Sequence, residues 1–128
     1  MAKLKFTSET GMFHSALCAD FGQGPEWYGY GPMLKGRPHG VGGVHTDDRT
    51  QDINHEINFI VDDGVLRAAI DAAVIEFTTT TYTVGVHDCV SFTAQIARKC
   101  GMTVPSTNFL PYNFLKALAA ANKYETFR

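Results

Sequence analysis

The sequence has only three cysteines, one tryptophan and a formal net charge of −2 over 128 residues. Three cysteines are too few and odd in number for a disulfide scaffold, so we expect reduced thiols. The chain has no basic run, and its pI near 6.2 argues against binding to nucleic acid or to an anionic membrane surface. No apolar stretch approaches the ~18–20 residues of a membrane span. These features indicate a globular protein.

The first residues, Met1 to Phe6, do not contain the apolar core of a signal peptide. We therefore expect synthesis in the cytoplasm without a signal peptide, and any export to use a specialised secretion system. The length suits one domain over residues 1–128, which should bury roughly two thirds of its unfolded surface.

Alternating apolar residues in the first half of the chain predict three strands, at residues 3–9, 13–21 and 26–32. Gly22–Pro25 is a turn signal that joins the last two as a hairpin. In the second strand, His14 shares a face with small residues such as Ala16 and Cys18. We expect a helix to pack close to that face, with His14 reaching past it.

The remaining elements follow from composition and periodicity. Residues 34–51 are rich in Gly, Pro, Asp and Thr and are predicted to form a long loop. Two further strands are predicted at 52–61 and 82–86, and helices at about 64–77, 89–100 and 112–122. This order predicts an α+β fold with an antiparallel sheet of about four to five strands packed against about three helices.

Cys89 is the main candidate for a reactive side chain. Asp88 stands where an N-cap belongs, which places Cys89 in the first turn of its helix. Unpaired backbone N–H groups and the positive end of the helix dipole favour an anion there. Because the thiolate is the reactive form, we expect a lowered pKa and a nucleophilic thiol.

A nucleophilic cysteine needs a base, and the chain has five histidines. His87 is only two residues from Cys89, so its side chain is expected to point away from the thiol. His39 and His45 fall in the predicted loop, where a catalytic group would be poorly held. His14 lies in a predicted strand, a rigid position that suits a general base. A Cys89–His14 pair is therefore our hypothesis for the catalytic dyad.

Three short motifs resemble those of circularly permuted NlpC-type papain-like cysteine hydrolases, a group that includes relatives of lecithin retinol acyltransferase. They are His-Asp-Cys-Val-Ser-Phe at 87–92, Phe-His-Ser-Ala-Leu at 13–17 and Tyr-Gly-Tyr-Gly-Pro at 28–32. In that family the histidine strand precedes the cysteine helix. The resemblance implies a papain-like fold, with Cys89 as nucleophile, His14 as base and a third polar residue that orients His14.

The third residue has several candidates. Relatives of the acyltransferase type space it about a dozen residues after the histidine, which falls on Glu26. Hairpin geometry instead places His14 opposite residues 31–33, with Tyr28 and Tyr30 nearer than Glu26, so Tyr28 is the second candidate. His55 on the next strand is a further candidate. The Asn-Cys-Glu-His pattern of the acyltransferase group is absent. Its absence favours the hydrolase branch over lipid acyl transfer.

The resemblance implies hydrolysis of an amide bond in a peptide or in a peptidoglycan stem peptide. A small protein of this kind would fit a secreted antibacterial effector with a cognate inhibitor (immunity) protein as partner. No cofactor is expected. We expect no metal either, because His45, Asp47 and Asp48 are irregularly spaced and no metal-ligand motif is present. An acyltransferase or deamidase with the same dyad and an inactive papain-like binding module are the alternatives.

Overall fold

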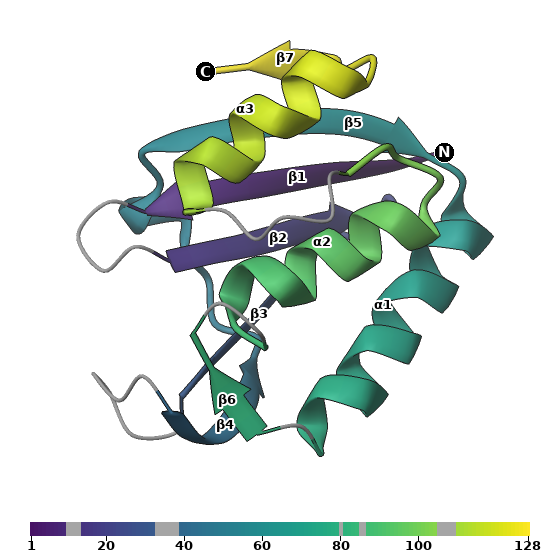
Figure 1. Cartoon of the computed structure of the whole chain (residues 1–128). Helices are drawn as coiled ribbons and strands as arrows, with labels where there is room; N and C mark the ends of the chain where they lie inside the picture. The colour runs from purple at the N-terminus through teal and green to yellow at the C-terminus, as the bar shows by residue number, and fades with distance from the viewer. Residues whose placement is uncertain (10–13, 33–38, 80, 85–86, 105–109) are drawn as a thin grey trace.

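The computed structural model describes residues 1–9, 14–32, 39–79, 81–84, 87–104 and 110–128. Within these ranges, three helices pack on one face of a seven-stranded antiparallel sheet (Figure 1). The predicted α+β class is confirmed.

The sheet has the strand order β6-β4-β3-β2-β1-β5-β7. Its strands are β1 (Ala2–Glu9), β2 (His14–Asp20), β3 (Pro25–Pro32), β4 (His39–His45), β5 (His55–Val61), β6 (Thr81–Thr83) and β7 (Thr126–Phe127). The predicted hairpin joins β2 and β3 in a register that sets Ala16 opposite Gly29. The central strands are therefore neighbours both along the chain and in space.

Two strands exceed the four or five that the sequence predicts. The C-terminal β7 pairs with β5 at its edge. β4 lies within the segment predicted as a loop, and it pairs with β3 on one side and β6 on the other. One glycine of β4 has a packing reason, because a Cβ added at Gly42 would overlap the hydroxyl end of Tyr30. This glycine, which contributed to the loop prediction, is thus an adaptation to a large neighbouring side chain.

The three helices begin where the sequence predicts. α1 (Asp63–Thr78) is capped by Asp62, whose carboxylate accepts a hydrogen bond from the Val65 backbone N–H. α2 (Cys89–Lys99) follows Asp88 as N-cap. α3 (Pro111–Ala121) has a proline in its first turn, where the missing N–H costs nothing. A short 3₁₀ turn, η1 (Thr50–Asp52), lies between β4 and β5.

The hydrophobic core lies between the helices and one face of the sheet, which we call the helix face. Tyr30 from β3 packs there against Phe77 of α1 and Phe92 of α2. Phe6 from β1 contacts Phe114 of α3 edge-to-face. All five of these aromatic side chains are at most 2% exposed. Two groups of aromatic side chains therefore tie the three helices to the sheet.

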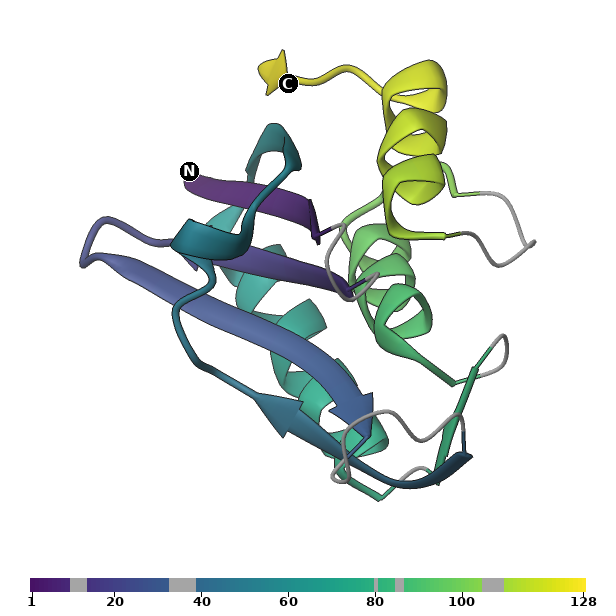
Figure 2. The ribbon, with the colours of Figure 1, turned by 90° about the vertical axis from the view of Figure 1, so that its left-hand side faces the viewer.

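The opposite side, which we call the open face, carries His14, in contrast to our expectation. Strand alternation directs Ser15 and Leu17 toward the helices, so His14, Ala16 and Cys18 point away from them. The expectation was wrong because Leu17 belongs to the buried core and takes the helix side. Figure 2 shows α2 and α3 on one side of the sheet and η1 on the other.

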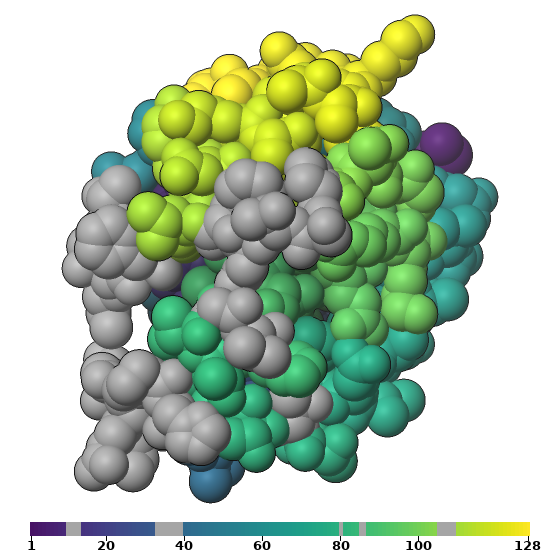
Figure 3. Space-filling view, in the orientation of Figure 1, coloured from purple at the N-terminus to yellow at the C-terminus, as the bar shows by residue number. Residues whose placement is uncertain are grey.

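On the helix face, the space-filling view shows side chains of α1, α2 and α3 covering the sheet (Figure 3). Among the described residues, no helix has the length and apolar character needed to cross a membrane.

Replacing Gly42 by alanine should destabilise the fold, because the new Cβ would overlap the fully buried Tyr30. Overpacking of this kind costs about 1–3 kcal/mol. Gly31→Ala is a matched control on the neighbouring strand, since a Cβ there has no atom of another residue within 4 Å. Urea unfolding of both variants measures the difference. Equal free energies of unfolding would show that Gly42 has no such packing role.

Candidate active site

The N-terminus of α2 is held by a capping box. The Asp88 carboxylate accepts a hydrogen bond of 3.0 Å from the Ser91 backbone N–H, and the Ser91 hydroxyl lies 3.2 Å from the Asp88 backbone N–H. These bonds satisfy two N–H groups that a helix start would otherwise leave unpaired. Cys89 is consequently the first residue of a rigidly started helix, as the sequence predicts.

Thr93 connects this first turn to the sheet. Its hydroxyl lies 3.2 Å from the hydroxyl of Ser15 on β2, and both side chains are fully buried. The same hydroxyl reaches back to the backbone carbonyl of Val90 at 3.1 Å. The Cys89 thiol in turn receives the backbone N–H of Ser15. The structure thus brings the thiol to the start of β2, one residue from His14.

The thiol of Cys89 is buried, with the residue only 8% exposed. Burial raises its pKa to about 11 and outweighs the lowering by the N–H groups of Ser15, Val90 and Cys89 itself. The expectation of a lowered pKa is therefore wrong for this state of the protein. The free-energy cost of desolvating the thiolate is larger here than the stabilisation that the helix start provides.

Tyr82 of β6 lies close to the same thiol. Burial raises the pKa of Tyr82 to about 12, and the charges of Cys89 and Asp88 act in the same direction. Its ring is 5.7 Å from that of Tyr30, which links it to the aromatic core. A tyrosine whose phenol is kept protonated therefore lies near the Cys89 thiol.

On the open face, the His14 ring contacts a second histidine, His45 at the end of β4. Their Nε2 atoms are 2.9 Å apart, and the ring centroids are 4.8 Å apart. Gly29 of β3 leaves the space for this pair, since a Cβ there would overlap the His45 ring and lie 3.1 Å from His14 Nε2. Strands β2, β3 and β4 together position the two imidazoles.

A chain of charged groups continues from His45. Its Nδ1 lies 2.8 Å from Asp47 Oδ1, although the ring N–H does not point straight at that oxygen. Arg49 binds Asp47 at 2.9 Å and also forms an ion pair with Glu9. The Glu9 side chain is 4% exposed and sits opposite His14 on the neighbouring strand β1. The arginine therefore ties the segment after β4 onto the sheet.

The position of the Asp47 carboxylate bears on the tautomers of the histidine pair. From its 2.8 Å approach to His45 Nδ1 we infer a proton on that nitrogen, which makes His45 Nε2 the acceptor of the hydrogen bond from His14 Nε2–H. The Nδ1 of His14 then carries an unshared electron pair. Burial, with smaller contributions from His45 and Arg49, lowers the pKa of His14 to about 3. The His14 ring is thus neutral at physiological pH.

The two predicted orienting residues, Glu26 and Tyr28, lie elsewhere. Both point to the helix face, where the Tyr28 hydroxyl donates to Glu26 at 2.8 Å. The carboxylate of Glu26 also pairs with Arg67 of α1 at 3.0 Å. The third candidate, His55, stacks on Tyr112 of α3 with ring centroids 4.0 Å apart. The His14 ring is instead hydrogen-bonded to His45.

Cys89 and His14 approach the same end of β2 from opposite faces of the sheet. The thiol lies on the helix side beside Ser15, whereas the imidazole lies on the open face with His45. The structure thus pairs His14 with His45, whereas the Cys89 thiol contacts the backbone of Ser15, the residue next to His14.

Sequence reasoning missed His45 because its segment was predicted to be a loop. The residues Gly42-Gly43-Val44-His45 have weak β propensity, and only the packing of Tyr30 accounts for Gly42. Asp47 and Asp48 were considered only as metal ligands. Among the residues that the structure describes, no group of three or more His, Cys, Asp and Glu side chains could hold a metal ion.

The lowered pKa of His14 predicts acid sensitivity. Between the unfolded pKa of 6.5 and the folded value of about 3, only the unfolded chain binds a proton at this ring, so lowering the pH favours unfolding. From pH 7 to pH 5 we expect a loss on the order of 2 kcal/mol from this group. His14→Gln should lose less stability over that interval. Urea titrations at both pH values measure it, and an unchanged pH dependence in the variant would contradict the assignment.

The raised pKa of Cys89 predicts slow alkylation. Iodoacetamide should modify Cys89 more slowly at pH 7 than an exposed thiol, and its rate should keep rising beyond pH 9, because the thiolate is the reacting form. Added glutathione is the reference thiol, because burial also raises the pKa of the partly exposed Cys100 to about 11. Mass spectrometry of glutathione and of the tryptic peptides gives both rates. A rate for Cys89 that is already maximal at pH 6 would reveal an activated thiolate instead.

Comparison with known proteins finds no matching family model, no similar curated protein and no similar solved structure.

Proposed function

We propose that this protein is a papain-like cysteine hydrolase of the circularly permuted type, with Cys89 as nucleophile and His14 as base. The observation that carries the proposal is the meeting of α2 and β2. Cys89 begins a capped helix and touches the Ser15 backbone, while the adjacent His14 has its Nε2 held by His45. A helix-start thiol and a partnered strand imidazole are the parts that such a reaction requires.

In this proposal His45 takes the orienting role that the sequence suggested for Glu26 or Tyr28. The hydrogen bond between the two Nε2 atoms fixes the His14 ring, and Asp47 fixes the tautomer of His45. A base that is oriented through its far nitrogen presents the other one, Nδ1, to a reacting group. The pair His45–Asp47 is thus a positioning device for His14.

The resting state has a protonated thiol and a neutral imidazole, because burial disfavours both charges. His14 would accept the thiol proton as the Cys89 sulfur forms a bond to the substrate carbonyl carbon. Two opposite charges that form together stabilise each other, which offsets the low basicity of an isolated buried imidazole. The backbone N–H of Cys89, at the helix start, would donate to the developing oxyanion.

Collapse of this intermediate would break the carbon–nitrogen bond, and the leaving amine would take the proton from His14. Water would then attack the thioester carbon and give a proton to His14, and the carbon–sulfur bond would break. The proton returns to the thiolate and the cycle closes. The substrate class is an amide, in a peptide or a peptidoglycan stem peptide.

A second candidate is an inactive papain-like binding module. The 8% exposure of Cys89 and the placement of His14 on the opposite face favour it. The hydrolase requires the thiol and the imidazole to meet when substrate binds, whereas the module does not. An assay with active-site variants therefore separates the two.

The test is incubation with purified peptidoglycan, followed by mass spectrometry of the new ends. Cys89→Ala should abolish cleavage, and His14→Gln should lower it by at least ~10²-fold, as expected for a general base. His45→Gln should lower the rate less and change its pH profile, because a positioning residue acts through His14. Cys18→Ala is the matched control, since this buried thiol lies on the open face away from α2.

Cleavage that survives in Cys89→Ala would eliminate the nucleophile and with it the proposal. No new ends with either peptidoglycan or a panel of peptides, from a protein that is folded by circular dichroism, would favour the binding module.

A further inference from the structure

The outer edge of β3 is paired with another strand over only part of its length. From Gly29 to Pro32 this edge pairs with β4, with Gly29 opposite His45. Residues 25–28 continue the strand and pair with β2 on the inner side. In the described part of the chain no strand pairs with their outer side, because β4 ends at His45. Four residues of a central strand, about 13 Å at ~3.3 Å per residue, therefore form an open sheet edge.

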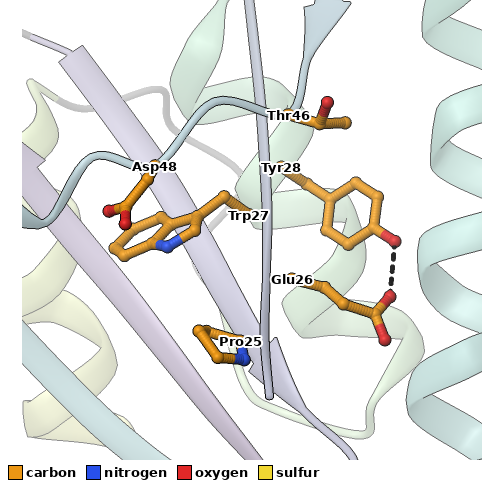
Figure 4. A pocket seen from close by; sticks show the side chains of 6 residues that line it. All are labelled: Pro25, Glu26, Trp27, Tyr28, Thr46 and Asp48. Atoms are coloured by element: carbon orange, nitrogen blue, oxygen red, sulfur yellow. Dashed lines mark hydrogen bonds between the residues drawn. The ribbon is translucent and has the colours of Figure 1, made fainter. Parts of the chain in front are cut away.

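A pocket of about 350 Å³ lies along this edge. It is lined by Pro25, Glu26, Trp27, Tyr28, Thr46 and Asp48, and its volume falls in the usual range for ligand sites. Figure 4 shows that Trp27 and Asp48 lie on one side of the strand, whereas Glu26 and Tyr28 lie on the other. The pocket thus straddles the edge and exposes both the backbone and the side chains of alternate faces.

Trp27 supplies an observation that points to a ligand. The residue is only 7% exposed, yet its indole Nε1–H has no hydrogen-bond partner. A buried donor without an acceptor costs about 1–3 kcal/mol, so most such groups in proteins are satisfied. In Figure 4 this nitrogen lies on the side of the ring that faces Pro25, another residue that lines the pocket. A carbonyl oxygen of a bound molecule would satisfy it.

The charges at the pocket indicate which side chains a ligand should carry. Glu26 is neutralised by Arg67 across the helix face. Asp48 is exposed, and its carboxylate accepts hydrogen bonds from the backbone and side chain of Thr50. These bonds lower the pKa of Asp48 and keep it ionised. An anionic group beside Trp27 suits a lysine or another amine-bearing side chain.

We propose that the open edge of β3 at residues 25–28 binds an extended peptide with a basic side chain, as an added strand of the sheet. The peptide backbone would pair with the strand edge, one of its carbonyls would accept from Trp27 Nε1–H, and a lysine would reach Asp48. An added strand makes backbone hydrogen bonds and uses pockets for alternate side chains. The edge ends at Gly29, which adjoins the His14–His45 pair. Peptide binding at this edge does not depend on Cys89 chemistry.

The probe is a fluorescein-labelled, N-acetylated hexapeptide, Lys-Val-Lys-Val-Lys-Val amide, titrated with full-length Cys89→Ser protein. This variant prevents loss of the probe by cleavage, so failure of the hydrolase proposal leaves the binding test unaffected. Fluorescence anisotropy should show saturable binding. Trp27 is the one tryptophan in the chain, so the single indole N–H resonance of ¹⁵N-labelled protein should shift downfield on binding.

Two modified peptides test the strand geometry, one N-methylated at every lysine and one at every valine. Because alternate residues donate to a strand on one side, one of the two should lose binding by at least tenfold and the other should keep it. Asp48→Asn should weaken binding of the unmodified peptide at least threefold, whereas the control Asp71→Asn, on an exposed site of α1, should not change it. Absence of saturable binding, an indole resonance that does not move, or equal affinity of all three peptides would each overturn the proposal.

Discussion

The docking of α2 on β2 is the contact on which the candidate site depends. Thr93 and Ser15 share a buried hydrogen bond, and the same first turn places the Cys89 thiol against the Ser15 backbone N–H. This contact adds a specific polar link to the apolar packing of Phe92 on Tyr30 that also docks the helix. A buried pair of hydroxyls is costly to separate, so the register of helix and strand is well defined.

The site also shows how burial competes with local electrostatics. A helix start and three backbone N–H groups favour a thiolate at Cys89, but desolvation is larger and raises the pKa. The same effect lowers the pKa of His14 in spite of the nearby Asp47. Both groups are therefore neutral at rest, which resembles a serine–histidine pair more than a preformed thiolate–imidazolium pair. In the proposed hydrolase, the energetic cost of forming these charges would fall on the catalytic step.

The open face of the sheet is organised by two features of β3. Gly29 gives the histidine pair its space, and residues 25–28 continue beyond the end of β4 as an open edge. Arg49 holds the segment after β4 near this face through Glu9 and Asp47. The His14–His45 pair and the Trp27 pocket therefore lie next to each other along β3.

The sequence by itself determined the features that are local in the chain. Capping residues predict the N-caps at Asp62 and Asp88, and turn residues predict the β2–β3 hairpin. Periodicity predicts the α+β class. Only the tertiary structure decided which face of β2 meets the helices, that the glycine-rich segment becomes β4, and that His45 rather than Glu26 adjoins His14. The physical reason is that side-chain burial and cross-strand packing, such as Tyr30 over Gly42, involve residues far apart in the chain. No local pattern encodes them.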